Sequence, residues 1–175
     1  MALIVEDGTI VAGAESYISV TGADTYLAKY GKDSVWKTKT VAEKEILLRI
    51  SRLYMDTKYY WKGKQATAGH ETNWPRSEVY VEGNLLNSDT VPADISNSNA
   101  LLASESASGA LYRNIDGGTT GQLVKSLEDG IGPLKSKTEY YDGASLASGS
   151  QVSYTEVNAM LRLYTLGGTR LLQRS

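Results

Sequence analysis

The chain has 175 residues, a formal net charge of −2 and no cysteine. Its length fits one domain that buries roughly 70% of the surface of the unfolded chain, and its small charge gives no global attraction to nucleic acid or anionic lipid. Without cysteine, disulfides, thiolate metal sites and cysteine nucleophiles are excluded. No run approaches the roughly 20 apolar residues of a membrane span, and the N-terminus lacks a signal-peptide pattern, so we expect synthesis in the cytoplasm and no membrane partner.

Tyrosine dominates the aromatic residues, with 12 tyrosines and no phenylalanine. Tyrosine packs like phenylalanine but keeps a polar tip, which suits surfaces that are buried only against a partner. Drift in composition explains the same count equally well.

Residues 1–19 are predicted to be extended, and two helices follow. The first runs from Thr21 to Gly31, because threonine caps helices and glycine favours their C-terminal ends. The second opens with a T-x-x-E capping box, Thr40 with Glu43. It continues for about five turns, to the segment KYYWKGK at residues 58–64.

An apolar stripe at helical spacing marks this second helix. Its members are Ile46, Ile50 and Leu53, widened by Leu47 and Tyr54. The stripe predicts a core helix. Charges of opposite sign stand four residues apart on the other face, and are expected to pair as Glu45–Arg49 and Arg52–Asp56.

A polar stretch and a third helix come next. Residues 63–90 are rich in Gly, Asn, Ser and Thr and are predicted to be a loop, which is unusually long unless it is functional or packed on itself. Pro92 is expected to open a helix that reaches about Arg113. Its small residues allow close approach to other helices, and its thin apolar face fits either a surface helix or one packed against several neighbours.

The C-terminal third predicts an arm and a last helix. Two strand-like segments flank the turn EDGIGP, which favours a β-hairpin or a two-stranded arm at residues 122–142. The last helix starts near Tyr154. The expected fold is therefore mainly α: one small helical bundle over residues 1–175, with a helical core at 20–113, the arm inserted at 122–142, and a C-terminal helix and tail at 153–175.

No pattern of residues indicates catalysis. His70 is the only histidine and stands in a glycine-flanked loop, where we expect it to be solvated. Neither cysteine nor histidine can supply a zinc site, and GGTTG at residues 117–121 lacks the Lys-Ser/Thr of a phosphate-binding loop. We expect no enzymatic activity, no catalytic, metal-binding or cofactor-binding residues, and no cofactor.

Nucleic-acid binding has some support between Lys37 and Lys64, where eight basic residues face three acids. Tyr59, Tyr60 and Trp61 alternate with lysines there, which is typical of a stacking surface for single strands. Against this interpretation, half of those basic residues lie in a helix that also carries acids. Residues 78–116 are acidic, so the two regions also suit association between copies of the chain.

Three motifs in order resemble one protein family. They are SYISVTGADTYLAKYG, AEKEILLRISRLYMDTKYYWKGK and NWPRS, with Trp36 between the first two. The set resembles the small head–tail connector proteins, or adaptors, of tailed phages, many of which are labelled DnaT-like ssDNA-binding protein. The match covers residues 1 to about 80, and the segments VPADI and VKSLEDGIGPLKSKTEY also fit. The Ser/Asn-rich third helix departs from the family, whose members are more apolar there.

The resemblance implies a structural virion protein of the phage neck, made in the host cytoplasm. It would form a ring of about twelve copies that joins the portal protein to neck or tail terminator proteins. DNA would pass through its lumen without sequence-specific binding. The alternative is a single-stranded-DNA-binding accessory protein of replication, as the DnaT-like label suggests.

The resemblance also assigns roles to particular residues. Trp61, Trp74 and Pro75 are the structural motif, in which Trp74 plugs the helix layer and Pro75 fixes the turn. Arg76 would bond to backbone carbonyls or to acids of a neighbouring subunit, which makes it a candidate interface residue. In the tail, the candidate interface residues are Arg170, Leu171, Leu172 and Arg174. Related adaptors use this end to hold the portal; alternatively, the two leucines fold back on their own helices.

Overall fold

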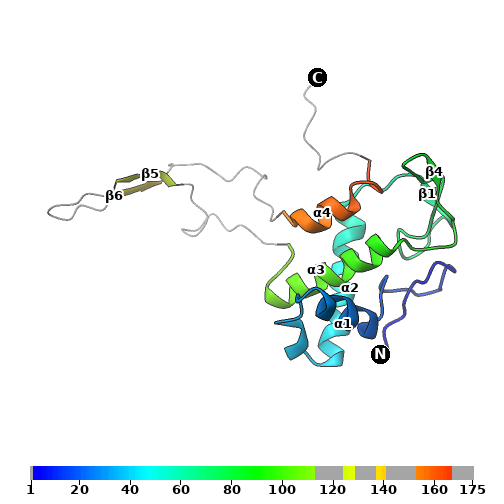
Figure 1. The fold of residues 1–175 in the computed structure, drawn as a ribbon, viewed down its shortest axis with the longest axis horizontal. Coiled ribbons are helices and arrows are strands. Elements are labelled where there is room, and N and C mark those ends of the chain that lie inside the picture. The colour runs from blue at the N-terminus through cyan, green and yellow to red at the C-terminus, as the bar shows by residue number, and fades with distance from the viewer. Residues whose placement is uncertain (1, 113–123, 129–136, 141–152, 167–175) are drawn as a thin grey trace, which may run out of the picture. The chain divides into compact units, whose positions relative to one another are not determined.

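A computed structural model describes residues 2–112, 124–128, 137–140 and 153–166 (Figure 1). The chain divides into two compact units, one made of Met1–Leu111 and Ser153–Ser175, the other of Tyr112–Val152. In the described residues the first unit has four α-helices and two pairs of very short strands, and the second has one pair of strands.

Side-chain caps start the first two helices. α1 (Val20–Lys29) begins after Ser19, whose Oγ accepts a hydrogen bond from the Gly22 backbone N–H at 3.0 Å, so the cap lies two residues before the predicted Thr21. A single 3₁₀ turn, η1 (Trp36–Thr38), leads to α2 (Val41–Lys58). The capping box is confirmed, because Thr40 Oγ1 accepts from the Glu43 N–H at 3.3 Å and Glu43 Oε2 accepts from the Thr40 N–H at 2.7 Å.

The prediction that the apolar stripe of α2 faces the core is wrong for its three main members. Ile46, Ile50 and Leu53 are 53%, 42% and 54% exposed. The buried residues of the helix are Leu48, Ser51, Tyr54 and Met55. Of the predicted stripe only Tyr54 is buried, and Leu47 is half-buried. Periodicity found an apolar face correctly but could not tell that this chain leaves most of it open to solvent.

The predicted ion pairs of α2 are both present. Arg49 Nη2 lies 3.7 Å from Glu45 Oε2, and Arg52 Nη1 lies 3.3 Å from Asp56 Oδ2. Arg49 also reaches Glu15, at 2.9 Å, and so fastens α2 to the N-terminal segment.

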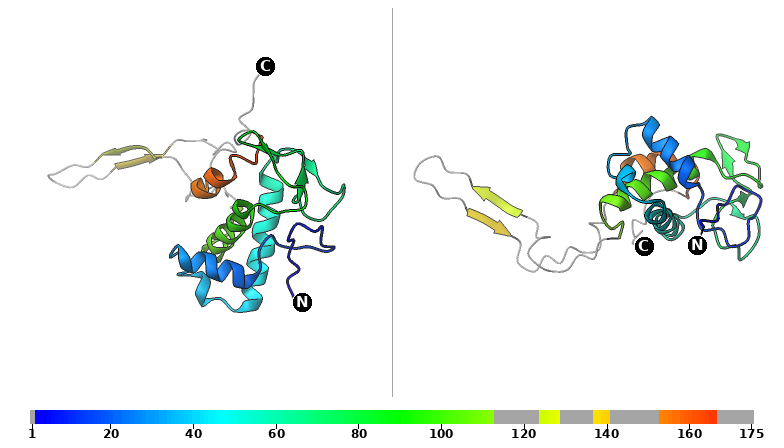
Figure 2. Two further views of the ribbon diagram at one scale, coloured as in Figure 1. Left: turned by 45° about the vertical axis from the view of Figure 1, so that its right-hand side comes forward. Right: turned by 90° about the horizontal axis from the view of Figure 1, so that it is seen from below.

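α3 (Ala93–Ser108) is the central helix and packs against α1, α2 and α4 (Figure 2). Small and polar residues make up much of its buried face, which lets its neighbours approach closely. Asn99 is the polar centre of this packing. Its Oδ1 accepts from Ser16 Oγ at 2.8 Å and from the Tyr17 N–H at 2.9 Å, while its Nδ2 donates to Ser51 Oγ and to the Leu48 carbonyl. Of the two interpretations of this helix, packing against several neighbours is confirmed.

The loop at residues 63–90 packs on itself. β1 (Lys64–Gln65) pairs with β2 (Arg76–Ser77), and β3 (Tyr80–Val81) pairs with β4 (Asn84–Leu85), both antiparallel. α4 (Thr155–Leu161) begins next to Tyr154, as predicted, and buries Val157 and Leu161.

The second unit contains the predicted hairpin. β5 (Val124–Glu128) and β6 (Lys137–Tyr140) run antiparallel, with Val124 opposite Tyr140 and Glu128 opposite Lys137. Residues 129–136, which include most of the predicted turn EDGIGP, lie outside the described residues. The described residues contain three pairs of strands as well as four α-helices. The fold is therefore mixed, and "mainly α" was too narrow a prediction.

Candidate functional site

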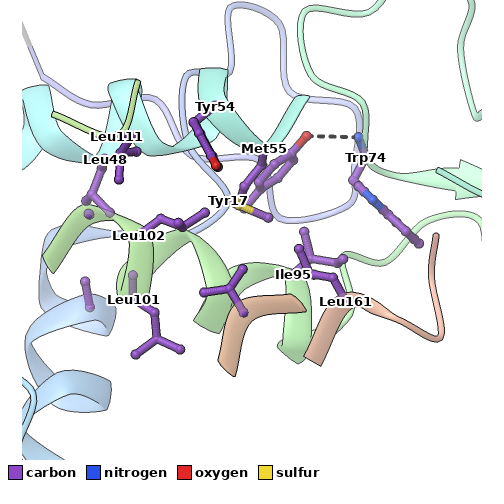
Figure 3. Close-up of a cluster of buried hydrophobic side chains, with 14 of the residues drawn as sticks. Tyr17, Leu48, Tyr54, Met55, Trp74, Ile95, Leu101, Leu102, Leu111 and Leu161 are labelled. Carbon is purple, nitrogen blue, oxygen red and sulfur yellow. Dashed lines mark hydrogen bonds between the residues drawn. The ribbon is translucent and has the colours of Figure 1, made fainter. Parts of the chain in front are cut away.

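The loop that carries Trp74, Pro75 and Arg76 is held in place by Tyr17. The Tyr17 hydroxyl accepts from the backbone N–H of Trp74 at 3.2 Å (Figure 3). It also accepts from the backbone N–H of Asn73 at 2.9 Å. It donates to Asp56 Oδ1 at 2.6 Å. Burial raises the pKa of Tyr17, and the carboxylate of Asp56 raises it further, so the hydroxyl keeps its proton and remains a donor.

Trp74 and Trp61 belong to an aromatic cluster in the core. The Trp74 ring meets the rings of Trp61 and Tyr164 edge to face, with centroids 5.8 Å apart in each pair. Within the described chain the ring nitrogens of both tryptophans have no hydrogen-bond partner, so the two rings are held by packing. The structure therefore places these two tryptophans and Pro75, which is also buried, in the protein interior.

Arg76 is a buried side chain that bonds to backbone carbonyls. Its Nε donates to the Lys62 carbonyl at 2.7 Å, its Nη2 to the Gly63 carbonyl at 2.8 Å and its Nη1 to the Asn73 carbonyl at 3.1 Å. Gly63 is required there, since its φ is +68° and a Cβ would collide with the carbonyl oxygen of Ser77. The guanidinium thus joins the start of the loop, at Lys62 and Gly63, to Asn73 further along it, and a role between subunits stays a prediction.

The side chain of His70 is only 6% exposed and anchors the loop, contrary to the expectation of a solvated residue. Its Nε2 lies 2.8 Å from Glu6 Oε2, and its Nδ1 lies 3.0 Å from Glu71 Oε2. Glu6 is itself buried and accepts three backbone N–H groups of the N-terminal segment. The cluster ties that segment to the loop. Sequence gave no sign of it, because Glu6 and His70 stand far apart in the chain.

The aromatic and basic residues at 58–64 are mostly engaged within the chain. Trp61 is buried, and the Tyr59 hydroxyl donates to Asn158 Oδ1 at 2.7 Å. Lys62 Nζ donates to the Leu163 carbonyl at 2.8 Å, and Lys64 Nζ lies 2.9 Å from Glu78 Oε1. Of the three rings predicted to form a stacking surface, only Tyr60 is well exposed.

A second aromatic and basic surface lies at the end of α1, and the sequence analysis did not predict it. Tyr30 is 57% exposed, and its ring centroid is 5.0 Å from that of Tyr26, one helical turn earlier. Lys29 Nζ lies 5.7 Å from the Tyr30 ring centroid. Two more exposed lysines follow closely, Lys32 and Lys37. We call Tyr26, Lys29, Tyr30, Lys32 and Lys37 the Tyr30 patch.

Acidic residues partly neutralise the positive charge of the Tyr30 patch. Lys32 Nζ pairs with Glu156, and Lys37 Nζ is 3.9 Å from Asp33 Oδ2. Both pairs are exposed to solvent, where an ion pair is worth little, so the ammonium groups remain able to exchange partners. The signal that would have found the patch is the i,i+4 spacing of Tyr26 and Tyr30 beside Lys29.

The solvent face of α2 is a further surface with functional potential. Five residues follow one line along it at helical spacing: Ala42, Ile46, Ile50, Leu53 and Thr57. We call this line the outer stripe. At one end it borders a shallow groove between α2 and α3, which Ile46 and Ala107 help to line.

The other predicted site residues fall outside the part that is described. Arg170, Leu171, Leu172 and Arg174 belong to residues 167–175, which the structure does not describe. Among the described residues there is no group of three or more His, Asp or Glu side chains placed to hold a metal ion. No described helix combines the length and apolar character that crossing a membrane requires.

Comparison with known proteins gives one match. The model of the family described as "Putative DnaT-like ssDNA binding protein" matches residues 1–174. No curated protein and no solved structure matches the chain. The label that accompanied the sequence resemblance thus agrees with this family, whereas the phage connector interpretation stays a prediction. Because the match runs along almost the whole chain, the protein belongs to the DnaT-like ssDNA-binding protein family.

Proposed function

We propose that this protein is a non-catalytic accessory protein that binds single-stranded DNA, weakly per chain, through the Tyr30 patch. The observation that carries the proposal is the exposed Tyr30 ring, which contacts the tilted ring of Tyr26 and has the ammonium group of Lys29 nearby. The description of the family supports the same activity.

The geometry fits binding without sequence preference. One base stacked on an exposed aromatic ring contributes about 1–3 kcal/mol whatever the base, since every base has a π face. The three exposed lysines can contact at most three phosphates, so we expect the logarithm of the binding constant to fall with the logarithm of salt concentration with a slope of about −2. Such binding is weak for one chain and needs several chains to become strong.

The variant Tyr30→Ala tests the proposal, and Tyr80→Ala is its matched control. Tyr80 is equally exposed, at 57%, but lies between Glu78 and Glu82, where phosphates are repelled. With a fluorescent thymidine oligonucleotide, we expect Tyr30→Ala to weaken binding about tenfold, because it removes one stacked base. Tyr80→Ala should bind like the wild type. Equal affinity of wild type and Tyr30→Ala would overturn the assignment to this patch.

A subunit of a phage head–tail connector ring is the second candidate. The apolar, exposed outer stripe of α2 favours it, because such a face suits a protein that works in an assembly. On this proposal the portal and the neck or tail terminator proteins are the partners, the virion neck is the location, and DNA contact is incidental. Immunogold labelling of purified virions would decide, since label at the neck supports the connector and its absence there contradicts it.

A further inference from the structure

We propose that Glu156 is a built-in competitor of DNA phosphate for Lys32, so that the protein itself limits how tightly single strands bind the Tyr30 patch. The inference rests on the proposed function and concerns the regulation of the same site. Lys32 is one of the three exposed lysines of the patch, and its Nζ pairs with Glu156 Oε2. This carboxylate comes from the first turn of α4, 124 residues further along the chain. It therefore reaches the patch through the packing of helices and not through local sequence.

The backbone of Lys32 is fixed by hydrogen bonds to two helices. Its N–H donates to the Leu27 carbonyl of α1 at 2.9 Å, and its carbonyl accepts from Ser104 Oγ of α3 at 2.8 Å. The side chain of Lys32, by contrast, is 40% exposed. The backbone therefore stays in place while the ammonium group can turn towards a phosphate.

The backbone of Glu156 is held by its neighbours in α4. Val157 is buried in the core, and Asn158 Oδ1 accepts from the Tyr59 hydroxyl at 2.7 Å. The side chain of Glu156 is 54% exposed, so its carboxylate can turn into solvent. Burial raises the pKa of Tyr26, and the charge of Glu156 raises it further, as expected of a carboxylate that also lies beside this tyrosine of the patch.

A phosphate and a carboxylate compete for Lys32 because both offer anionic oxygens to its ammonium group. A strand has to break the Lys32–Glu156 pair before Lys32 can contact a phosphate, and the released carboxylate then stands as a negative charge beside the strand. An ion pair between exposed side chains is weak, so the competition lowers affinity without abolishing binding. A second acid beside the patch, Asp33, lies 3.9 Å from Lys37, at the limit of a direct ion pair, so Glu156 is the closer competitor.

The variant Glu156→Gln tests the competition, and Glu78→Gln is its matched control. Glu78 forms an exposed ion pair with Lys64, so both changes remove one negative charge and release one lysine, but Lys64 does not belong to the patch. In fluorescence anisotropy with a thymidine oligonucleotide, we expect Glu156→Gln to bind about three- to fivefold more tightly, the gain that loss of a competing exposed ion pair allows. Glu78→Gln should stay within about twofold of the wild type. Equal gains in the two variants would assign the effect to net charge and overturn the proposal.

The variant Lys32→Gln identifies the lysine through which Glu156 acts. In a chain that already carries Lys32→Gln, the change Glu156→Gln should alter affinity by less than about twofold, because no ammonium group remains to be released. A full gain in that background would overturn the proposal. If the wild type and Tyr30→Ala bind equally, the proposed function fails and this inference fails with it. If Tyr30→Ala binds more weakly but Glu156→Gln binds like the wild type, this inference alone fails.

Discussion

Two residues in contact with the Tyr17 hydroxyl, Trp74 and Asp56, contribute to stability in different ways. Tyr17 accepts a hydrogen bond from the Trp74 backbone and donates one to the Asp56 carboxylate. Trp74 contributes through the apolar packing of a fully buried ring. Asp56 carries a charge into a place where water is largely excluded, and its contribution therefore depends on pH.

Trp74→Ala is expected to reduce the free energy of unfolding by about 3–5 kcal/mol, because it empties the centre of the aromatic cluster. Chemical denaturation at fixed pH measures the loss, and Tyr80→Ala, which removes an exposed ring, serves as the control with little change. Unchanged stability of Trp74→Ala together with lost self-association would show that the ring anchors an interface instead.

Asp56→Asn should change how stability depends on pH. Burial raises the pKa of Asp56 above its ordinary value of 3.8, although the Tyr17 hydroxyl and Arg52 oppose this. The folded state therefore holds a proton that the unfolded state has already lost, and stability falls as the pH rises from 3.8 through the raised pKa. Asparagine has no such proton, so the stability of the variant relative to the wild type should rise across that window in urea unfolding experiments.

Glu43→Gln is the matched control of opposite sign. Hydrogen bonds from Thr40 lower the pKa of Glu43 below its ordinary value of 4.5. Its contribution is present above pH 4.5 and is lost as the pH falls through the lowered pKa. The stability of this variant relative to the wild type should thus decline as the pH rises. The same trend in both variants would contradict the assignment of the raised pKa to Asp56.

At the scale of elements, α2 shows which features could be predicted from sequence. Its cap at Thr40, its length and its two i,i+4 ion pairs depend on neighbours within a turn or two, and all were predicted correctly. Its buried face depends on α3. Asn99 selects the side of α2 that offers Ser51 and the Leu48 carbonyl, and this choice involves residues some fifty positions apart.

In the candidate sites, too, features that depend on neighbours in the sequence could be predicted, and features that depend on distant residues could not. The aromatic run at 58–64 was visible as composition, but its contacts come from Asn158 in α4 and from the Leu163 carbonyl just after that helix. The Tyr30 patch is local to α1 and could have been found from the spacing of its tyrosines. The anchoring of His70 could not, because its partner Glu6 comes from the other end of the first 70 residues.

At the scale of the whole molecule, DNA binding through the Tyr30 patch makes a prediction about DNA length. Two chains that associate carry two Tyr30 patches, and a strand long enough to reach both binds the second patch at a high effective concentration. Avidity of this kind can raise affinity by about a hundredfold or more without any new contact.

We therefore expect the wild type to bind a thymidine oligonucleotide of about 40 nucleotides much more tightly than one of about 8, which fills a single small site. The gain should exceed the roughly 33-fold statistical advantage of the longer strand, which offers about 33 overlapping sites of 8 nucleotides where the short strand offers one. Ile50→Glu should keep the affinity for the short strand, because its Tyr30 patch is intact, and it tests whether the exposed apolar face of α2 contributes to the excess. Tyr30→Ala should lose affinity for both lengths. Fluorescence anisotropy at one salt concentration measures all six combinations. A preference for long strands that stays within the statistical advantage would show that the DNA-binding unit is the single chain.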